Sequence, residues 1–155
     1  MTLIKAHRCL SPFVFAIFFA SHHVNLYSDP LITYPLIINT HEIRVELANE
    51  PIGRAQGLMA RKSLRNDRGM VFAFPTERVF SMWMKDTPLD LTVLFADKQG
   101  RIIEIAKMKR NTLDSHSSNK PAMFALEINS DSPLTKIVKV GDLLLGLEKL
   151  PAAKN

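Results

Sequence analysis

The feature that most constrains the fold is a series of short apolar or alternating segments, separated by turn residues, between residues 36 and 147. His41–Leu47 alternates between apolar and polar residues, which is typical of a half-buried strand. Leu91–Ala96 is apolar on both faces, which predicts a central strand. The other strand-like segments are 36–38, 69–74, 79–85, 101–106, 121–128 and 143–147. This spacing predicts a mainly β fold, a small antiparallel β-sandwich or barrel-like single domain.

One or two short helices are expected between the strands. Asn49 is expected to cap the first, with Pro51 in its first turn and Gly57 at its end. Ser132-Pro133 predicts a second helical turn, because serine is a good N-cap and proline fits the first helical position. Pro75 is expected to close the strand 69–74.

The N-terminal residues resemble a targeting segment. Residues 1–8 are short and basic, and residues 9–20 are apolar. This order predicts a signal peptide over residues 1–20, because the apolar run is shorter than the about 20 residues of a membrane-spanning helix. An uncleaved N-terminal anchor, with membrane contact through it, is the second choice, and a buried strand is the third. We expect an exported protein, periplasmic or otherwise extracytoplasmic, with a linker at 21–35 and a β domain at 36–150.

Charge and cysteine content exclude several classes of function. The formal net charge is +5, and two of the positive charges, Lys5 and Arg8, lie in the N-terminal segment. Such a mild balance, with no dense basic stripe, predicts no nucleic-acid partner. The single cysteine, Cys9, lies in the apolar run. The folded part therefore has no disulfide, thiol nucleophile or cysteine-based zinc site.

Six linked motifs resemble a known family, domain of unknown function 192. They are Gly57-Leu58-Met59 with Arg61, Gly69-Met70-Val71-Phe72, Trp83-Met84-Lys85 with Thr87, Phe95 and Asp97 with Gly100, Leu126-Glu127, and Val140-Gly141-Asp142. The resemblance covers about residues 36–148. It implies a compact, mainly antiparallel β-sandwich-like fold that is frequently exported, and it implies no activity.

The chain departs from the pattern of that family at two places. The family reads Thr-x-x-Pro-Leu-Asp, whereas here Pro88-Leu89-Asp90 follows Thr87 directly. The position of the family's aspartate is therefore open between Asp90 and Thr92. The family also places glycine soon after Leu-Glu, where this chain has Asn129-Ser130-Asp131, so we expect a different loop there.

Charged residues on apolar strands indicate a candidate site. Lys85 ends a hydrophobic segment, and Glu127 interrupts another. A charge in such a place is either solvated or paired. Arg61, Lys85 and Glu127 are expected to line one pocket, with Trp83 as a wall, for a small anionic or zwitterionic ligand or an envelope component. A structural ion pair is the alternative.

The sequence shows no motif of a known enzyme, so no catalytic residue, metal ligand or cofactor is assigned. The first interpretation is an exported, non-catalytic binding or accessory domain. The second is a hydrolase-like enzyme that acts on an envelope component, and the third is a Cu(I)-handling protein that uses Met82 and Met84. The methionines are also explained as core filling. His41 and His116 are expected in turns or on the surface. The basic run 54–68 is interpreted as a solvated face, with contact to lipid headgroups as the alternative.

Overall fold

The structure is a computed structural model that describes residues 31–155. The segment predicted to be a signal peptide or anchor, and the linker as far as residue 30, lie outside the described residues. The described elements are β1 Tyr34–Ile38, β2 His41–Ala48, α1 Pro51–Gln56, β3 Arg68–Arg78, β4 Ser81–Met82, β5 Leu91–Ala96, β6 Ile102–Met108, β7 His116–Ser117, β8 Ala122–Asn129, the 3-10 helix Pro133–Lys136, β9 Leu144–Leu145 and the 3-10 helix Leu147–Lys149.

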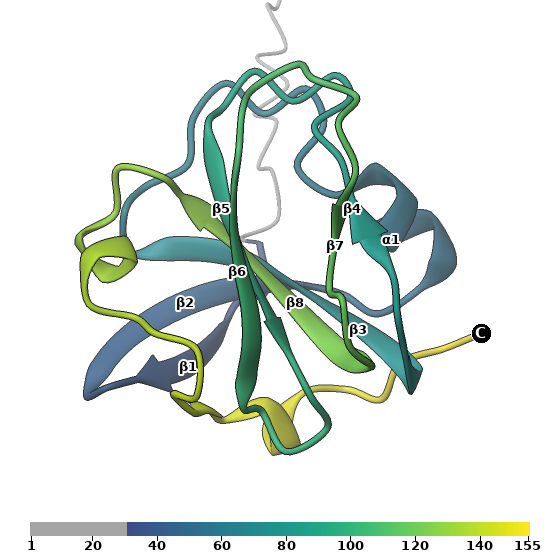
Figure 1. The fold of residues 1–155 in the computed structure, drawn as a ribbon, viewed down its shortest axis with the longest axis vertical. Coiled ribbons are helices and arrows are strands. Elements are labelled where there is room, and N and C mark those ends of the chain that lie inside the picture. Colours follow the sequence, from purple (N-terminus) through teal and green to yellow (C-terminus); the bar gives the residue numbers. More distant parts are fainter. Residues whose placement is uncertain (1–30) are drawn as a thin grey trace, which may run out of the picture.

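A curled sheet dominates the described part of the chain and forms a half-barrel (Figure 1). Within residues 31–155 it has seven strands in the order β6-β5-β8-β3-β2-β1-β9, and β4 and β7 form a separate pair. The mainly β fold class is confirmed. All neighbouring strands are antiparallel except β2 and β3. No helix within residues 31–155 combines the length and the apolar character needed to span a membrane.

The parallel pair of β2 and β3 explains the position of α1. Parallel neighbours cannot be joined by a tight turn, so the chain must cross over between them. Residues 49–67, which include α1, form this crossover. Glu50, not the expected Asn49, precedes the helix as its N-cap residue; Asn49 instead donates a hydrogen bond of 2.9 Å from its side chain to the Ala152 carbonyl. Pro51 and Gly57 begin and end the helix as expected.

Two clusters of buried side chains cover the two faces of the sheet, and β5 contributes to both. Leu94 and Ala96 pack in one cluster, and Leu91, Val93 and Phe95 pack in the other. β5 is therefore buried on both sides, as its sequence predicts. The second cluster also contains Leu58, which follows α1, so we name that side of the sheet the α1 face.

The predicted strands near Pro75 were wrong in extent. β3 does not end at Phe74 but continues through Pro75 to Arg78, and its register with β8 shifts between Ala73 and Arg78. Proline is tolerated in a strand at such an irregularity, where the ladder of hydrogen bonds is interrupted. The predicted strand 79–85 is mostly irregular, and only Ser81–Met82 pairs, with β7.

The two ends of the strand order meet at one corner. β9 pairs with β1, and the residue before it, Leu143, forms a bridge with Arg101 at the start of β6. The Leu144 amide donates a hydrogen bond of 2.8 Å to the carbonyl of Gly100. Residues 141–145 therefore connect both edges of the half-barrel, and we name this contact the corner.

Candidate functional site

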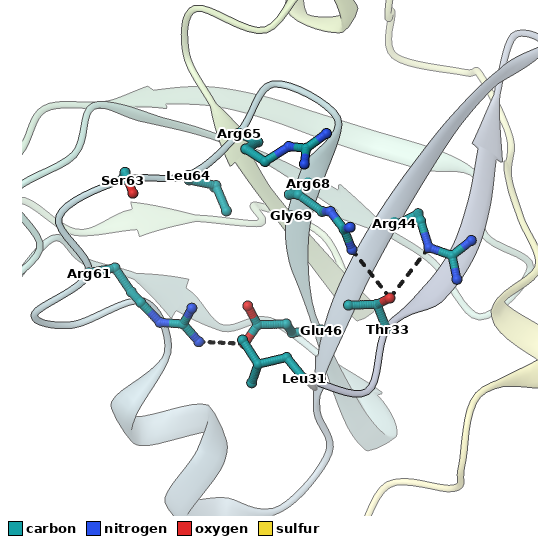
Figure 2. Close-up of a pocket in the computed structure, with 10 residues that line it drawn as sticks. All are labelled: Leu31, Thr33, Arg44, Glu46, Arg61, Ser63, Leu64, Arg65, Arg68 and Gly69. Carbon is teal, nitrogen blue, oxygen red and sulfur yellow. Dashed lines mark hydrogen bonds and ion pairs between the residues drawn. The ribbon is translucent and has the colours of Figure 1, made fainter. Parts of the chain in front are cut away.

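A pocket of about 410 Å³ lies between β2, the start of β3 and the loop that follows α1 (Figure 2). Its polar lining is dominated by four arginines, accompanied by one glutamate. These charged residues are Arg44, Glu46, Arg61, Arg65 and Arg68. We name this hollow the arginine pocket. Its size falls in the range of small-molecule sites, roughly 300–1,000 Å³.

The strand register brings two of these arginines side by side. Ile43 and Val45 of β2 point into the first core cluster, so the alternate residues Arg44 and Glu46 project on the α1 face. The parallel register then pairs Arg44 with Arg68 of β3. Two guanidinium groups on neighbouring strands repel each other unless a negative charge lies between them.

The group between these two arginines is a neutral hydroxyl. Arg44 Nε and Arg68 Nη1 donate to Thr33 Oγ1 over 3.4 and 3.3 Å, and Figure 2 shows both converging on it. These bonds are long, and a hydroxyl is a weaker acceptor than an anion. Arg44 also lies 3.5 Å from the exposed Glu42. Within residues 31–155, Arg68 has no carboxylate at ion-pairing distance.

The other two arginines are paired with acids. Arg61 Nη2 donates to Glu46 Oε2 at 2.5 Å in a partly buried contact. Arg65 donates two hydrogen bonds to Asp67, and this contact lowers the pKa of the Asp67 carboxyl. Asp67 is exposed, so water screens the pair and it contributes little to stability. Arg68 therefore has no compensating carboxylate within residues 31–155, and Arg44 has only the long contact with the exposed Glu42.

A second, smaller pocket of about 30 Å³ lies between α1 and residues 82–87. Glu127 lines it from β8 and is 3% exposed. Its neighbours in the lining are Arg54, Ala55, Gln56, Gly57, Leu58, Met59, Phe72, Met82, Trp83 and Thr87. We name this hollow the Glu127 pocket.

The Glu127 carboxyl has no hydrogen bond or ion pair with any side chain or backbone group of residues 31–155. On the neighbouring strands, Met70 and Val93 occupy the positions opposite it. Burial among such groups disfavours the charged form and raises the pKa of Glu127 to about 8. The carboxyl is therefore mostly protonated at neutral pH.

The walls of the Glu127 pocket are joined by a hydrogen bond between two unusual residues. The Ala60 amide donates to the Asp86 carbonyl at 2.8 Å. Both residues have positive φ angles, 61° and 52°, which are uncommon for residues other than glycine. This contact fixes the loop after α1 against the segment that carries Trp83.

The four residues predicted to form one pocket are separated: two line the Glu127 pocket, one lines the arginine pocket, and Lys85 lines neither. Trp83 and Glu127 line the Glu127 pocket, and Lys85 Nζ lies 5.6 Å from the centre of the Trp83 ring. Arg61 lines the arginine pocket instead, where it pairs with Glu46. Arg61, Lys85 and Glu127 form no ion pair with one another.

Sequence reasoning did not assign Arg44 or Gln56 to a site, and it considered Arg54 only as part of the basic run 54–68. Arg44 could be found only from the parallel register with Arg68, which no local pattern reveals. Arg54 Nη1 donates to the carbonyls of Asn49 and Ala73, and its Nη2 donates to the backbone carbonyl of Lys154. This arginine therefore connects α1 to the surrounding backbone.

The methionines and histidines take different positions. Met84 is fully buried in the second core cluster, and the partly buried Met82 packs against this cluster. His41 is exposed, as expected, but His116 of β7 is half-buried opposite Met82, and its Nε2 has no hydrogen-bond partner within residues 31–155. No three His, Cys, Asp or Glu side chains of residues 31–155 gather into a metal site.

The two candidates for the family's aspartate have different surroundings. Asp90 is exposed, accepts a hydrogen bond of 2.8 Å from the Arg110 amide and lies 3.5 Å from the Arg110 guanidinium. Thr92 is buried in β5, 3.1 Å from the Ser130 hydroxyl. Neither residue lines the arginine pocket or the Glu127 pocket.

Comparison with known proteins identifies the family. The model of the DUF192 family, described as an uncharacterized ACR, matches residues 35–145. The chain belongs to this family. A similar crystal structure, of a protein from Sinorhizobium meliloti 1021 described as a "putative transcription regulator", is 35% identical, with 74% of this chain and 96% of that chain covered and a TM-score of 0.68.

A protein of unknown function from Novosphingobium aromaticivorans DSM 12444 is 27% identical, with 77% of this chain and 89% of that chain covered and a TM-score of 0.68. The comparison with curated proteins gave no match. The DUF192 resemblance of the sequence is therefore confirmed, and the family brings no established activity with it.

Proposed function

We propose that this DUF192 protein is an exported, non-catalytic binding domain that holds a small anionic ligand in the arginine pocket. The observation that carries the proposal is the convergence of Arg44 and Arg68 on the neutral hydroxyl of Thr33. An anionic phosphate or carboxylate group would accept shorter, charge-assisted hydrogen bonds from both guanidinium groups. It would also remove the repulsion between them.

The absence of catalytic groups around this pocket supports binding rather than catalysis. Among the described residues, its lining contains no histidine, cysteine, lysine or aspartate, and its one glutamate pairs with Arg61. A hydrolase needs a base within reach of a nucleophile. Neither the Thr33 nor the Ser63 hydroxyl makes a hydrogen bond with this glutamate.

Titration with inorganic phosphate at low ionic strength tests the anion site. We expect phosphate to raise the melting temperature, because a ligand that binds the folded state stabilises it. Arg44→Gln and Arg68→Gln should each weaken phosphate binding by about tenfold or more, since each removes a hydrogen bond between charged groups. Calorimetry measures these affinities.

Arg110→Gln is the matched control. Arg110 is exposed and lies 3.5 Å from Asp90, as Arg44 does from Glu42, but it does not line the arginine pocket. This variant should bind phosphate as the wild type does. Equal losses in all three variants would reduce the effect to net charge and contradict the proposal.

Vesicles and DNA separate the possible sources of the anion. If the ligand is a small soluble anion, free phosphate should displace anionic lipid vesicles from the protein. The protein should also bind the vesicles no more tightly than it binds phosphate. Duplex DNA is a second probe, because the relative from S. meliloti is described as a "putative transcription regulator". Binding of random duplex DNA that outcompetes phosphate through Arg44 and Arg68 would replace the small ligand by a nucleic acid.

Export rests on the basic and apolar order of residues 1–20. Cell fractionation should find the full-length chain outside the cytoplasm, and deletion of residues 1–20 should retain the protein inside. A cytoplasmic full-length protein would contradict the export proposal and leave the anion site to be judged by the phosphate titration.

A further inference from the structure

We propose that the Glu127 pocket is a second binding site, which takes a primary ammonium group between the Glu127 carboxylate and the ring of Trp83. The inference does not depend on the anion site, because the Glu127 pocket has its own lining. The ligand proposed here is a cation, whereas the arginine pocket is proposed to bind an anion. Glu127 does not line the arginine pocket.

Glu127 is isolated from hydrogen-bond donors. The residue is 3% exposed and lines a pocket, yet no donor within residues 31–155 bonds to its carboxyl group. A buried polar group without a partner is unfavourable. A ligand that brings hydrogen-bond donors would satisfy this carboxyl.

An aromatic side chain forms part of the pocket wall. Trp83 lines the pocket and remains 49% exposed, and the ammonium group of Lys85 already lies 5.6 Å from the centre of its ring. The face of tryptophan attracts cations within about 6 Å. The ring therefore accepts a primary ammonium group in this structure, from the chain itself. A carboxylate beside such a ring is a suitable pair for a cationic ligand.

The small size of the pocket restricts the ligand. The pocket measures about 30 Å³, which is the room of one or two water molecules. An ammonium group at the end of a chain is about as large as a water molecule. A trimethylammonium group is several times larger and would not fit unless the walls moved.

The charged groups around Glu127 leave room for this role. Arg54 also lines the pocket, but its guanidinium donates to backbone carbonyls and lies 5.1 Å from the ring centre of Phe74. Lys85 and Asp86, in the segment 82–87 that forms one side of the pocket, are exposed. β3 and β5 place the uncharged Met70 and Val93 opposite Glu127. Within residues 31–155 no cation pairs with the carboxyl group, and a ligand would supply one.

Binding should depend on pH in one direction. An ammonium ion prefers the carboxylate, whereas the empty site holds the protonated acid up to a pKa of about 8. Binding must therefore release a proton at neutral pH. Affinity for a primary amine should rise about tenfold per pH unit from pH 6 to 8 and level off above that range, as long as the amine stays protonated.

Titration of the protein with methylammonium chloride tests the proposal. The carboxyl carbon of Glu127, observed by NMR, should titrate near pH 8 without the amine and at lower pH with it. Glu127→Gln should abolish methylammonium binding, and Trp83→Leu should weaken it at least fivefold. Tetramethylammonium should bind at least tenfold more weakly than methylammonium.

Glu148→Gln is the control, because Glu148 is exposed and has no ion pair within residues 31–155. This variant should bind methylammonium as the wild type does. Phosphate affinity should be unchanged in Glu127→Gln, so that failure at one site is distinguishable from failure at the other.

Three results would overturn the inference. They are a Glu127 titration that saturating methylammonium does not move, equal affinities for methylammonium and tetramethylammonium, and an affinity that falls as pH rises towards 8. If Glu127→Gln does not fold, Trp83→Leu provides the test, because Trp83 is 49% exposed. Unchanged methylammonium binding in Trp83→Leu would also overturn the inference.

Discussion

At the scale of single residues, Glu127 differs most from its surroundings. It lies in β8 between Leu126 and Ile128, which are both fully buried on the other face of the sheet. Its own face is apolar apart from the small pocket, so the charged form is poorly solvated. The carboxyl therefore stays neutral well above its usual range. This neutral state couples the stability of the fold to pH.

Removing this carboxyl should change how stability depends on pH. The folded pKa, about 8, lies above the reference value of 4.5, so the folded state binds the proton more tightly than the unfolded state. This contribution is fully present below about pH 4.5 and is lost as pH rises to about 8. The loss is about 1.4 kcal/mol per pH unit between these limits. Glu127→Gln should not show it.

Urea denaturation of both proteins at pH 5, 6.5 and 8 measures this effect. The free energy of unfolding of Glu127→Gln relative to the wild type should increase at each step. A difference that is the same at all three values would mean that the carboxyl is solvated in the folded state, which would contradict the pKa assigned to it.

At the scale of elements, the patterns with a period of two were reliable. They predicted the alternation in β2, and the continuous apolar run 91–96 predicted that β5 is buried on both faces. The predicted strand 79–85 was wrong because the apolar residues of this segment have another role. Phe80 and Met84 pack on the α1 face as a cover, and most of the segment forms no strand. A hydrophobic pattern indicates burial, but it does not distinguish a buried strand from an irregular segment that covers a sheet.

The same limit applies to the candidate site. Glu127 could be selected from the sequence, because a charge within an apolar strand requires an explanation. Arg44 could not, because it belongs to an ordinary polar side of a strand. Its importance comes from Arg68, which lies beside it through the crossover of α1. A contact of this kind depends on the order of strands, which local patterns do not contain.

At the scale of the whole molecule, the corner decides whether the sheet has open edges. Gly100 is central to it, since its φ angle is +80° and a Cβ there would lie 2.5 Å from the Leu144 carbonyl oxygen. Gly141, in the same corner, has a φ angle of +100° but nothing within 4 Å of a Cβ. An alanine at Gly141 therefore adds backbone strain alone, whereas an alanine at Gly100 adds backbone strain and a steric clash.

Gly100→Ala should destabilise the protein clearly more than Gly141→Ala. Both variants carry the strain of a positive φ angle, about 1–3 kcal/mol, and Gly100→Ala also pushes the Leu144 backbone away. Urea denaturation measures the difference, and light scattering should show association of Gly100→Ala alone, because loss of the corner exposes strand edges. Equal stabilities would mean that the corner adjusts without cost.

The corner also has a consequence for the order of folding. It joins strands that are distant in the sequence, since Ile38 pairs with Leu144. Closing so long a loop costs more conformational entropy than pairing neighbouring strands, and such contacts form slowly. The central strands can pair first, while β1 and β6 still present unpaired edges. The time before residues 141–145 dock is therefore the period in which a newly made chain is most exposed to association with other chains and most in need of a chaperone.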